Sequence, residues 1–393
     1  MRCDVAIIGG GLTGCASAYY LGKSGASVVL LEEGELNGGA SGRNAGSLHF
    51  QLEHRHVAHE ERLAKSLEHL VRLSRVAIDQ WRGLEEELGE DLELVMHGGL
   101  MVAETDAEVA KLERKALVEA RHGLETQLLD GAEVRRIAPY LSERVRAASL
   151  CRDEGHCNPR LLTPAFARKS VALGAVLHTR TRIRSLYRDS GRWIVEASEP
   201  NGAAAEPVIA DAVLDAAGAW AGEIAAMANF HLPIFPVGLL MNVTERVGPC
   251  IHHLIQHVGR RISMKQTHDG NIMIGGGWSV RMRRDAASRW VPGTPDLETV
   301  RGNLRIASEL APMIQDAHLI RTWSGIAGVT TDQLPIIGEI GGSRFFVAGG
   351  GSGFTFGPTY ARLISEQIVT GRADGSLEPY SPARFDHINM FMG

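Results

Sequence analysis

Residues 9–14 read Gly-Gly-Gly-Leu-Thr-Gly and match the dinucleotide-binding pattern G-x-G-x-x-G. The apolar run Val5–Ile8 precedes this motif, a segment of helical character over 15–22 follows it, and a second apolar run over 27–31 comes next. Because the glycines stand between a predicted strand and a predicted helix, they meet the context that the motif requires. The sequence therefore predicts a compact βαβ unit at the start of the chain.

Each conserved position of this pattern has a physical task that its residue can perform. Gly9 makes the turn, Gly11 admits a pyrophosphate, and Gly14 lets the helix pack closely on the strand. The amides at the helix N-terminus then face the phosphates. Glu32, at the end of the second strand, can accept hydrogen bonds from an adenosine ribose. We predict that these four residues bind a dinucleotide cofactor.

Hydrophobic patterning predicts alternating helices and strands along the rest of the chain. The charged, leucine-rich segment 53–88 has helical spacing, whereas residues 235–311 alternate apolar and polar positions, which favours antiparallel strands with one wet face. Further helices are predicted over 106–121, 131–137, 160–173 and 358–370. Further strands are predicted over 98–103, 176–178 and 345–348, and another strand ends at the small-residue turn 213–218.

The length and net charge of the chain limit its possible functions. The chain has 393 residues, of which 44% are hydrophobic and 22% charged, enough for two interleaved domains around a large cofactor. A net charge of −5 argues against nucleic acid as the main partner. No secretory signal precedes the first strand and no stretch has the roughly 20 apolar residues that span a bilayer. We expect a cytoplasmic protein whose membrane contact, if it has one, is peripheral and through partners.

Five cysteines without regular spacing are typical of a reducing compartment rather than of a disulfide scaffold. Cys151 and Cys157 suggest an iron–sulfur or zinc site, but no second pair and no histidine at metal-ligand spacing accompanies them. We therefore predict no metal site in this chain.

A loop rich in small residues helps to decide between NAD and FAD as the dinucleotide. It reads Gly39-Ala40-Ser41-Gly42-Arg43-Asn44-Ala45-Gly46. With this loop the sequence resembles the D-amino-acid oxidase and glycine oxidase superfamily of flavoproteins, whose members place a similar loop against the pyrophosphate and the flavin. The resemblance implies that the cofactor is FAD and that Ser41, Gly42, Arg43 and Asn44 contact it. A solvated glycine loop is the alternative for this stretch taken alone.

Three further blocks, 215–220, 331–338 and 349–355, look like the same family, so the resemblance spans almost the whole chain. Small side chains in the first and third blocks permit backbone amides to approach a phosphate or the flavin pyrimidine edge. The FAD contacts implied there are Ala217, Gly218, Gly350, Gly351, Ser352, Gly353, Phe354 and Thr355. The third block has no cysteine and His49 does not stand where relatives place a linking histidine, so we expect noncovalent FAD.

The fold implied by the resemblance is α/β, with a Rossmann-type, glutathione-reductase-like FAD domain interleaved with an α+β substrate domain that contains an antiparallel sheet. We expect the FAD-binding domain to comprise residues 1–90, 147–225 and 320–393. The substrate domain would comprise residues 91–146 and 226–319.

Within the superfamily, the runs 41–49, 274–278 and 321–325 look most like the catalytic (beta) subunits of opine oxidase, of hydroxyproline and proline dehydrogenases, and of hydrogen cyanide synthase. These relatives imply electron-transfer partner subunits that carry a second flavin or an iron–sulfur cluster. The chain departs from glycine oxidase at Ala327, where that enzyme's block has a carboxylate-binding arginine. Another group must therefore pair the carboxylate of an amino-acid substrate.

The chemistry implied by the family is hydride transfer from the carbon that bears the nitrogen to flavin, which oxidises the C–N bond of an amino acid or secondary amine. The protein then has to orient the substrate, select the neutral amine and exclude water. The candidate substrate-pocket residues are His49, Gln51, His252, His253 and Lys265. For each histidine a satisfied surface or core position is the alternative, and for Lys265 an exposed position on the wet face of a strand.

Other functions stay open at this point. The alternatives are a self-contained amine oxidase of the glycine or sarcosine type that makes hydrogen peroxide, and a noncatalytic flavoprotein assembly subunit. The intact set Gly9, Gly11, Gly14 and Glu32 argues against the last of these. An NAD-dependent dehydrogenase is disfavoured because the chain ends on a glycine-rich block of flavoprotein type.

Overall fold

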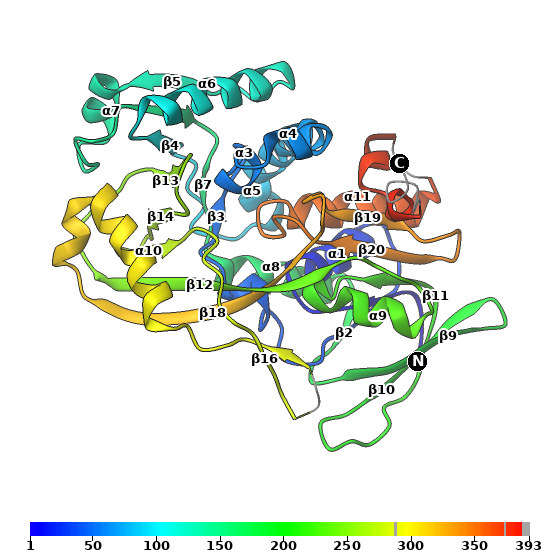
Figure 1. Ribbon diagram of the computed structural model, residues 1–393. Helices are drawn as coiled ribbons and strands as arrows, with labels where there is room; N and C mark the ends of the chain where they lie inside the picture. Colours follow the sequence, from blue (N-terminus) through cyan, green and yellow to red (C-terminus); the bar gives the residue numbers. More distant parts are fainter. Residues whose placement is uncertain (287–288, 373–374, 387–393) are drawn as a thin grey trace.

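Two eight-stranded sheets lie side by side and organise the molecule (Figure 1). The structure is a computed structural model and describes residues 1–286, 289–372 and 375–386. The first sheet has a parallel centre, and helices lie against it. The second sheet is largely antiparallel, and α7 and α10 lie on its outer side (Figure 1). The α/β architecture predicted from the sequence is confirmed.

The first sheet has the strand order β19-β20-β11-β1-β2-β8, and a meander of β9 and β10 continues from β11. Its strands are β1 (Arg2–Ile8), β2 (Val28–Leu31), β8 (Val176–His178), β9 (Arg182–Asp189), β10 (Arg192–Ser198), β11 (Val208–Asp215), β19 (Ile336–Glu339) and β20 (Phe345–Gly349). Both faces are covered, which is why β2 and β20 are apolar at every position. One face packs against α1 (Leu12–Lys23), α8 (Pro159–Ala172) and α11 (Gly357–Thr370), and the other packs against β10 and α9 (Ala221–Met227).

The predicted βαβ unit is present as β1, α1 and β2. Parallel pairing brings Ile8 opposite Leu31, so both strands end beside the glycine turn. The helix N-terminus therefore opens at the carboxyl edge of the sheet, which is where ligands bind in open α/β sheets.

The second sheet has the order β18-β12-β15-β14-β13-β4-β6-β5. All of its pairings are antiparallel except that of β13 with β4. Its strands are β4 (Gly99–Ala103), β5 (Gln127–Asp130), β6 (Ala147–Cys151), β12 (Phe235–Arg246), β13 (Leu254–His257), β14 (Ser263–Gln266), β15 (Asn271–Gly275) and β18 (Leu319–Val329).

The two faces of the second sheet have different neighbours. On its outer face a large apolar core joins the sheet to α7 (Gly131–Ile137) and α10 (Leu297–Leu310). On its inner face Met101 and Ala103 pack with Val57 and Leu112, which belong to helices α3 (His54–Val57) and α6 (Asp106–Arg121). The inner face therefore looks towards the segment that follows the predicted flavin loop.

The remaining elements lie outside the two eight-stranded sheets. They are α2 (Ala40–Arg43), α4 (Glu60–Arg82), α5 (Leu84–Leu88), the two-strand pairs β3 (Ser47–Leu48) with β7 (Gly155–His156) and β16 (Arg283–Arg284) with β17 (Trp290–Val291), and the short 3-10 helices Gly218–Trp220, Pro312–Asp316, Gly375–Tyr380 and Pro382–Phe385.

One expectation was wrong. The alternation predicted over 235–311 breaks at α10, whose N-terminus is capped by Asp296 Oδ1 accepting from the amide of Thr299. The predicted domain boundary at 319/320 falls at the start of β18, and this strand pairs with β12 along the second sheet. Residues 320–329 therefore belong to a strand of the second sheet, and the domain division stays a proposal.

Within the part of the chain that the structure describes, none of the helices has the length and apolar character that crossing a bilayer would require.

Candidate cofactor and substrate site

The glycine turn is closed so tightly that backbone atoms leave no space for a side chain at two of its positions. Gly9 has a φ of +108°, and a Cβ atom there would lie 2.6 Å from the carbonyl oxygen of Ala216. A Cβ atom on Gly14 would lie 1.9 Å from the oxygen of Gly9. Gly11 is less enclosed, because its Cβ atom would meet only Ser41, at 3.0 Å from Oγ. Gly9 and Gly14 thus shape the turn, while Gly11 leaves backbone surface for a ligand.

The carboxylate of Glu32 is fixed at the end of β2. Its two oxygens accept hydrogen bonds from the amides of Gly10 and Gly34, each at 2.7 Å. Because a carboxylate oxygen can accept more than one hydrogen bond, this arrangement leaves capacity for hydroxyl donors. The position and chemistry are those that an adenosine ribose requires.

The predicted flavin loop docks on the N-terminus of α1. Ser41 Oγ accepts from the amide of Leu12 at 2.9 Å, and Arg43 Nε donates to the carbonyl of Gly38 at 3.0 Å. Asn44 closes the loop, because its Oδ1 accepts from the amide of Gly46 at 2.6 Å. Ser41 thus lies where the helix amides would face a pyrophosphate.

The block 349–355, from the other end of the chain, meets the segment that follows this loop. Gly350 and Gly351 have φ values of +81° and +62°, so the chain turns back beside the sheet at positions that favour glycine. Thr355 Oγ1 accepts from the amide of His49 at 3.2 Å, and Ser352 Oγ accepts from Arg55 at 2.6 Å. The N-terminal and C-terminal motifs therefore form one continuous cradle.

The block 215–220 forms an edge of this cradle with small residues, and it contains a buried carboxyl group, that of Asp215. Asp215 is fully buried at the end of β11, its Oδ1 accepts from the amide of Ala217 at 3.0 Å, and its Oδ2 is without a partner in the described chain. Burial raises the pKa of Asp215 to about 8, and the bond from Ala217 only partly offsets this. The carboxyl group is therefore mainly protonated at neutral pH.

These residues fit a flavin dinucleotide. The turn provides open backbone at Gly11, Glu32 provides acceptors at the ribose position, and the closely packed loop 39–46 provides a wall beside the helix N-terminus. The individual FAD contacts predicted from the sequence, including Ala217, Gly218, Gly353 and Phe354, stay predictions.

His49 and Lys265 come together across the two sheets. His49 follows β3, and its Nε2 lies 3.2 Å from the Oγ of Ser263 at the start of β14. Its Nδ1 is buried without a hydrogen-bond partner among the described residues. Burial lowers the pKa of His49, and the nearby Lys265 contributes to the lowering in a minor way.

Lys265 is a buried amine rather than a surface lysine. It is 3% exposed, and within the described segments it makes no hydrogen bond or ion pair. Burial lowers its pKa to about 7, with only weak opposition from Cys157 and Glu93. Burial also lowers the pKa of the neighbouring His156 to about 3. This region of the inner sheet face therefore disfavours positive charge.

Gln51 belongs to a buried polar network and not to an open pocket. Its Nε2 donates to Glu154 at 2.9 Å, and its Oε1 accepts from Lys115 at 2.8 Å and from Ser149 at 2.9 Å. Lys115 also donates to Glu119 at 2.8 Å. Because both ends of its amide are occupied, we do not carry Gln51 into the proposed substrate site.

This network holds the segment that follows His49. Glu154 Oε1 accepts from the amides of Phe50 and Gln51, each at 2.8 Å, and Glu119 Oε1 accepts from the amide of Leu52 at 2.7 Å. Sequence reasoning missed Glu154, Lys115 and Glu119 because no local pattern connects residues so far apart. Nothing in the sequence distinguishes Lys115 from the other charged residues of the helix 106–121, since Glu113 and Arg114 directly precede it.

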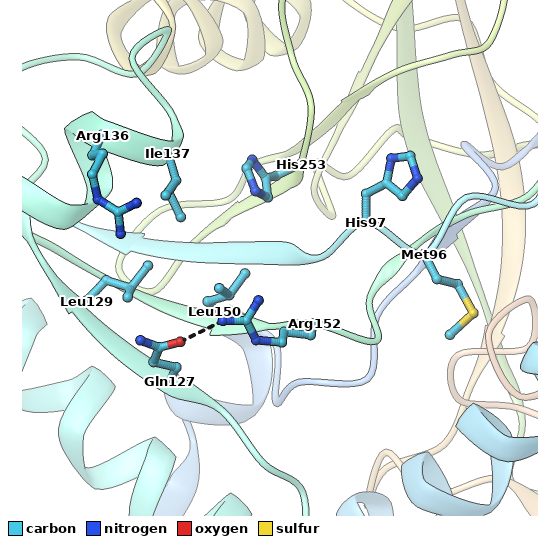
Figure 2. A pocket seen from close by; sticks show the side chains of 9 residues that line it. All are labelled: Met96, His97, Gln127, Leu129, Arg136, Ile137, Leu150, Arg152 and His253. Carbon is cyan, nitrogen blue, oxygen red and sulfur yellow. Dashed lines mark hydrogen bonds between the residues drawn. The ribbon is translucent and has the colours of Figure 1, made fainter.

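His253 lies on the other side of the second sheet. Met264, which precedes Lys265, belongs to the outer core, so the side chain of Lys265 points to the inner face. His253 instead lines a cavity with Leu129 and Leu150 of the outer core (Figure 2). The structure does not bring His253 together with His49 and Lys265, and we do not carry it into the proposed substrate site.

His252 is exposed, and its ring meets that of Tyr140 edge-on at 6.1 Å. Cys151 and Cys157 are buried free thiols, and burial raises the pKa of both. Within residues 1–286, 289–372 and 375–386, no three His, Cys, Asp or Glu side chains are grouped in a way that could hold a metal ion.

Comparisons with known proteins agree with this geometry. The family model "FAD dependent oxidoreductase" (DAO) matches residues 4–367. The glycine oxidase of Geobacillus kaustophilus is 29% identical over 393 residues, covering 98% of this chain and 97% of that enzyme. The human mitochondrial dimethylglycine dehydrogenase is 26% identical, but this chain spans only 44% of its length.

Two further relatives bear on assembly. The sarcosine oxidase subunit beta of Rhodobacter capsulatus is 26% identical over 94% of this chain and 86% of that subunit. The crystal structure of L-proline dehydrogenase from P. horikoshii superposes with a TM-score of 0.85 at 25% identity, covering 98% of both chains.

Proposed function

This chain belongs to the DAO family of FAD-dependent oxidoreductases, and from this premise we propose that it oxidises the C–N bond of a small amino acid or secondary amine of the proline, hydroxyproline, D-amino-acid or opine type. We propose further that it does so as the catalytic subunit of a heteromeric complex. Enzymes named for glycine, sarcosine and proline among its relatives support an amine or amino-acid donor.

FAD is the cofactor of this family, and when bound it would supply the acceptor for hydride. Gly11 and the N-terminus of α1 would hold the pyrophosphate, and Glu32 would hold the ribose. The loop 39–46 and the block 349–355 would then enclose the remaining part of the cofactor. Their position places the inner face of the second sheet opposite the cradle, since His49 contacts both the block 349–355 and β14.

The observation that carries the assignment to amines is the environment of His49, His156 and Lys265. Burial lowers the pKa of all three groups, so their surroundings penalise positive charge. The same surroundings would lower the pKa of a substrate ammonium group. Hydride leaves a carbon attached to nitrogen only when the nitrogen lone pair is available, so this face would select the neutral amine.

Lys265 is our candidate for pairing the substrate carboxylate. Ala327 lies opposite Val237 in the pairing of β18 with β12 and offers no charge. The amine of Lys265 makes no ion pair with any residue that the structure describes, and an approaching carboxylate would favour its protonated form. One lysine would thereby replace the arginine clamp of glycine oxidase, without the bidentate geometry that arginine gives.

The complex is supported by relatives that are named as subunits. The alternative, a self-contained oxidase that reduces oxygen to hydrogen peroxide, is favoured by one observation: glycine oxidase matches this chain over nearly its entire length. A noncatalytic assembly role has no such observation behind it.

An anaerobic titration of the purified FAD-loaded protein tests the proposal. Glycine, sarcosine, D- and L-proline, hydroxyprolines, D-amino acids and opines are added singly while the flavin absorbance is followed. We expect one compound of the proline or opine type to bleach the flavin. If air then restores the absorbance slowly and an artificial electron acceptor restores it quickly, the dehydrogenase assignment holds, whereas rapid peroxide formation in air identifies the self-contained oxidase.

Lys265→Met is the matched variant for this experiment. We expect it to retain FAD and to weaken binding of carboxylate-bearing substrates by about tenfold or more, since a charge-assisted contact is lost. Unchanged affinity in this variant would remove Lys265 from the site. No bleaching by any member of the panel in a protein that holds FAD would contradict the proposed substrate class.

A further inference from the structure

A second candidate binding site lies on the outer face of the second sheet, away from the cradle. It is a cavity of about 430 Å³ under α7, between this helix and strands β5 and β6. Figure 2 shows Arg136 and Ile137 on one side of the cavity and Gln127, Leu150 and Arg152 on the other. Its volume lies within the range of about 300–1,000 Å³ typical of small-molecule sites.

The cavity brings together cationic groups that have no counter-ion. Arg136 makes no hydrogen bond or ion pair with any residue that the structure describes, and Arg152 donates only to the neutral amide of Gln127, at 3.1 Å. His97 and His253 complete the polar lining, and none of the described residues that line the cavity is acidic.

Other arginines close to β6 do have acidic partners. Arg146, the residue directly before β6, pairs with Asp106, and Arg144 pairs with Glu104. The acids closest to α7 along the chain are already used, because Asp130 caps the helix and Glu133 completes the capping box. The positive potential inside the cavity is therefore not cancelled by its immediate surroundings.

The apolar floor of the cavity and the imidazole ring of His253 are held in place by their neighbours. Leu129 and Leu150 are 5% and 7% exposed and belong to the outer core, so they give the cavity a fixed apolar base. The hydroxyl of Tyr140 lies 2.8 Å from Nδ1 of His253. When this hydroxyl donates, the neutral imidazole carries its proton on Nε2 and can donate in turn to a ligand.

We propose that this cavity binds a small anion with two or more oxyanion charges, either a dicarboxylate or a phosphate. Two guanidinium groups offer planar pairs of donors that match carboxylate and phosphate oxygens, and the histidines add neutral donors. The site lies on the opposite face of the sheet from Lys265, so the ligand is distinct from the substrate proposed above and its binding does not depend on oxidation.

Calorimetric titration of the FAD-loaded protein tests this site. Inorganic phosphate and succinate are titrated separately at constant ionic strength, with chloride as the monovalent reference. We expect saturable binding of at least one of the two anions and none of chloride. Binding of phosphate alone would assign the phosphate class, and binding of succinate alone the dicarboxylate class.

The variants Arg136→Gln and Arg152→Gln should each weaken binding about tenfold, since each removes a charge-assisted contact. Arg135→Gln is the matched control, because Arg135 is the preceding exposed residue on α7 and does not line the cavity. A full flavin complement in all variants would show that they are folded. No binding heat for either anion, or equal weakening by all three variants, would overturn the proposal.

Discussion

Asp215 is buried at the carboxyl end of β11 with one of its two oxygens unpartnered in the described chain. Its pKa is raised to about 8 in the folded protein, whereas the unfolded chain has the ordinary value of 3.8. Between these values the folded state binds more protons than the unfolded state, so the contribution of Asp215 to stability is complete below about pH 4 and is lost as pH rises through 8.

Asp215→Asn should remove this dependence. The variant keeps an acceptor for the amide of Ala217 and has no charge to bury. Between pH 5 and 7.5, we expect Asp215 to lower the free energy of unfolding of the wild type by up to about 1.4 kcal/mol per pH unit. In the variant this contribution to the pH dependence should be absent. Urea unfolding at pH 5 and pH 8.5 measures the difference. Parallel pH profiles for the two proteins would show that Asp215 is not protonated in the fold.

Gly11 is the residue at which cofactor binding is most directly testable. Gly11→Val would fill the backbone surface needed for the pyrophosphate and press on Ser41 Oγ, which is already at 3.0 Å from the position of a Cβ atom. We expect an apoprotein of lower stability, measured by the ratio of flavin to protein absorbance. Gly83→Ala, at a glycine with nothing within 4 Å of its Cβ position, is the control. A full flavin complement in Gly11→Val would refute the assignment of this turn.

At the scale of secondary-structure elements, the buried ion pair ties α6 to the segment after β3. The side chains of Lys115 and Glu119 are both fully buried. Glu119 accepts a hydrogen bond from the backbone amide of Leu52, and Lys115 donates one to the side chain of Gln51. Breaking such a pair leaves an uncompensated charge in the interior.

Lys115→Met is expected to lower the free energy of unfolding by about 3–5 kcal/mol, since Glu119 loses its counter-ion. Lys111→Met serves as the control one helical turn earlier, where the lysine is half-buried and makes no bond within the described residues, and a change within about 0.5 kcal/mol is expected there. Denaturant unfolding of both variants provides the measurement. A small loss in Lys115→Met would mean that the network relaxes without strain.

Elements whose signals are local could be predicted from the sequence. The βαβ unit, helix 106–121 and strand 176–178 depend on neighbouring residues, and the structure has them at or near those bounds. Helix α10 was missed because a general alternation over 235–311 hid its helical spacing. Strand β18 was not predicted, because its partner β12 lies about 80 residues earlier and strand pairing leaves no local trace in the sequence.

The candidate site shows the same limit. His49 and Lys265 were selected from motif position, and the structure brings them near each other, but Gln51 and His253 point elsewhere. Both residues lie in short connections beside strands, and their directions depend on partners more than 100 residues away, Glu154 for Gln51 and Tyr140 for His253.

For the whole molecule, contact between the two sheets runs through the flavin loop. Trp323 Nε1 on β18 donates to the carbonyl of Arg43 at 2.8 Å, and Arg43 in turn lies 3.3 Å from the Cβ position of Gly325. The second sheet therefore supports the loop that would enclose the cofactor.

Trp323→Phe should loosen this support without opening the core of either sheet, since Trp323 is only half-buried. We expect FAD affinity to fall up to about tenfold, the cost of one hydrogen bond and its ordering effect on the loop. Equilibrium dialysis against FAD measures the change, and Trp290→Phe, on the separate pair β16–β17, is the control. Equal FAD affinity in wild type and Trp323→Phe would show that the loop is held by its own contacts.

The strand order of the first sheet also has a consequence for biosynthesis. The central strand β11 has β1 on one side and β20 on the other, and β20 begins at Phe345. A ribosome that has made the glycine turn at residues 9–14 must therefore add more than 300 further residues before the cradle can close around a nucleotide. Cofactor capture has to follow synthesis of these late strands, so a nascent chain exposes an unfinished sheet edge for most of its translation and is a natural client for chaperones.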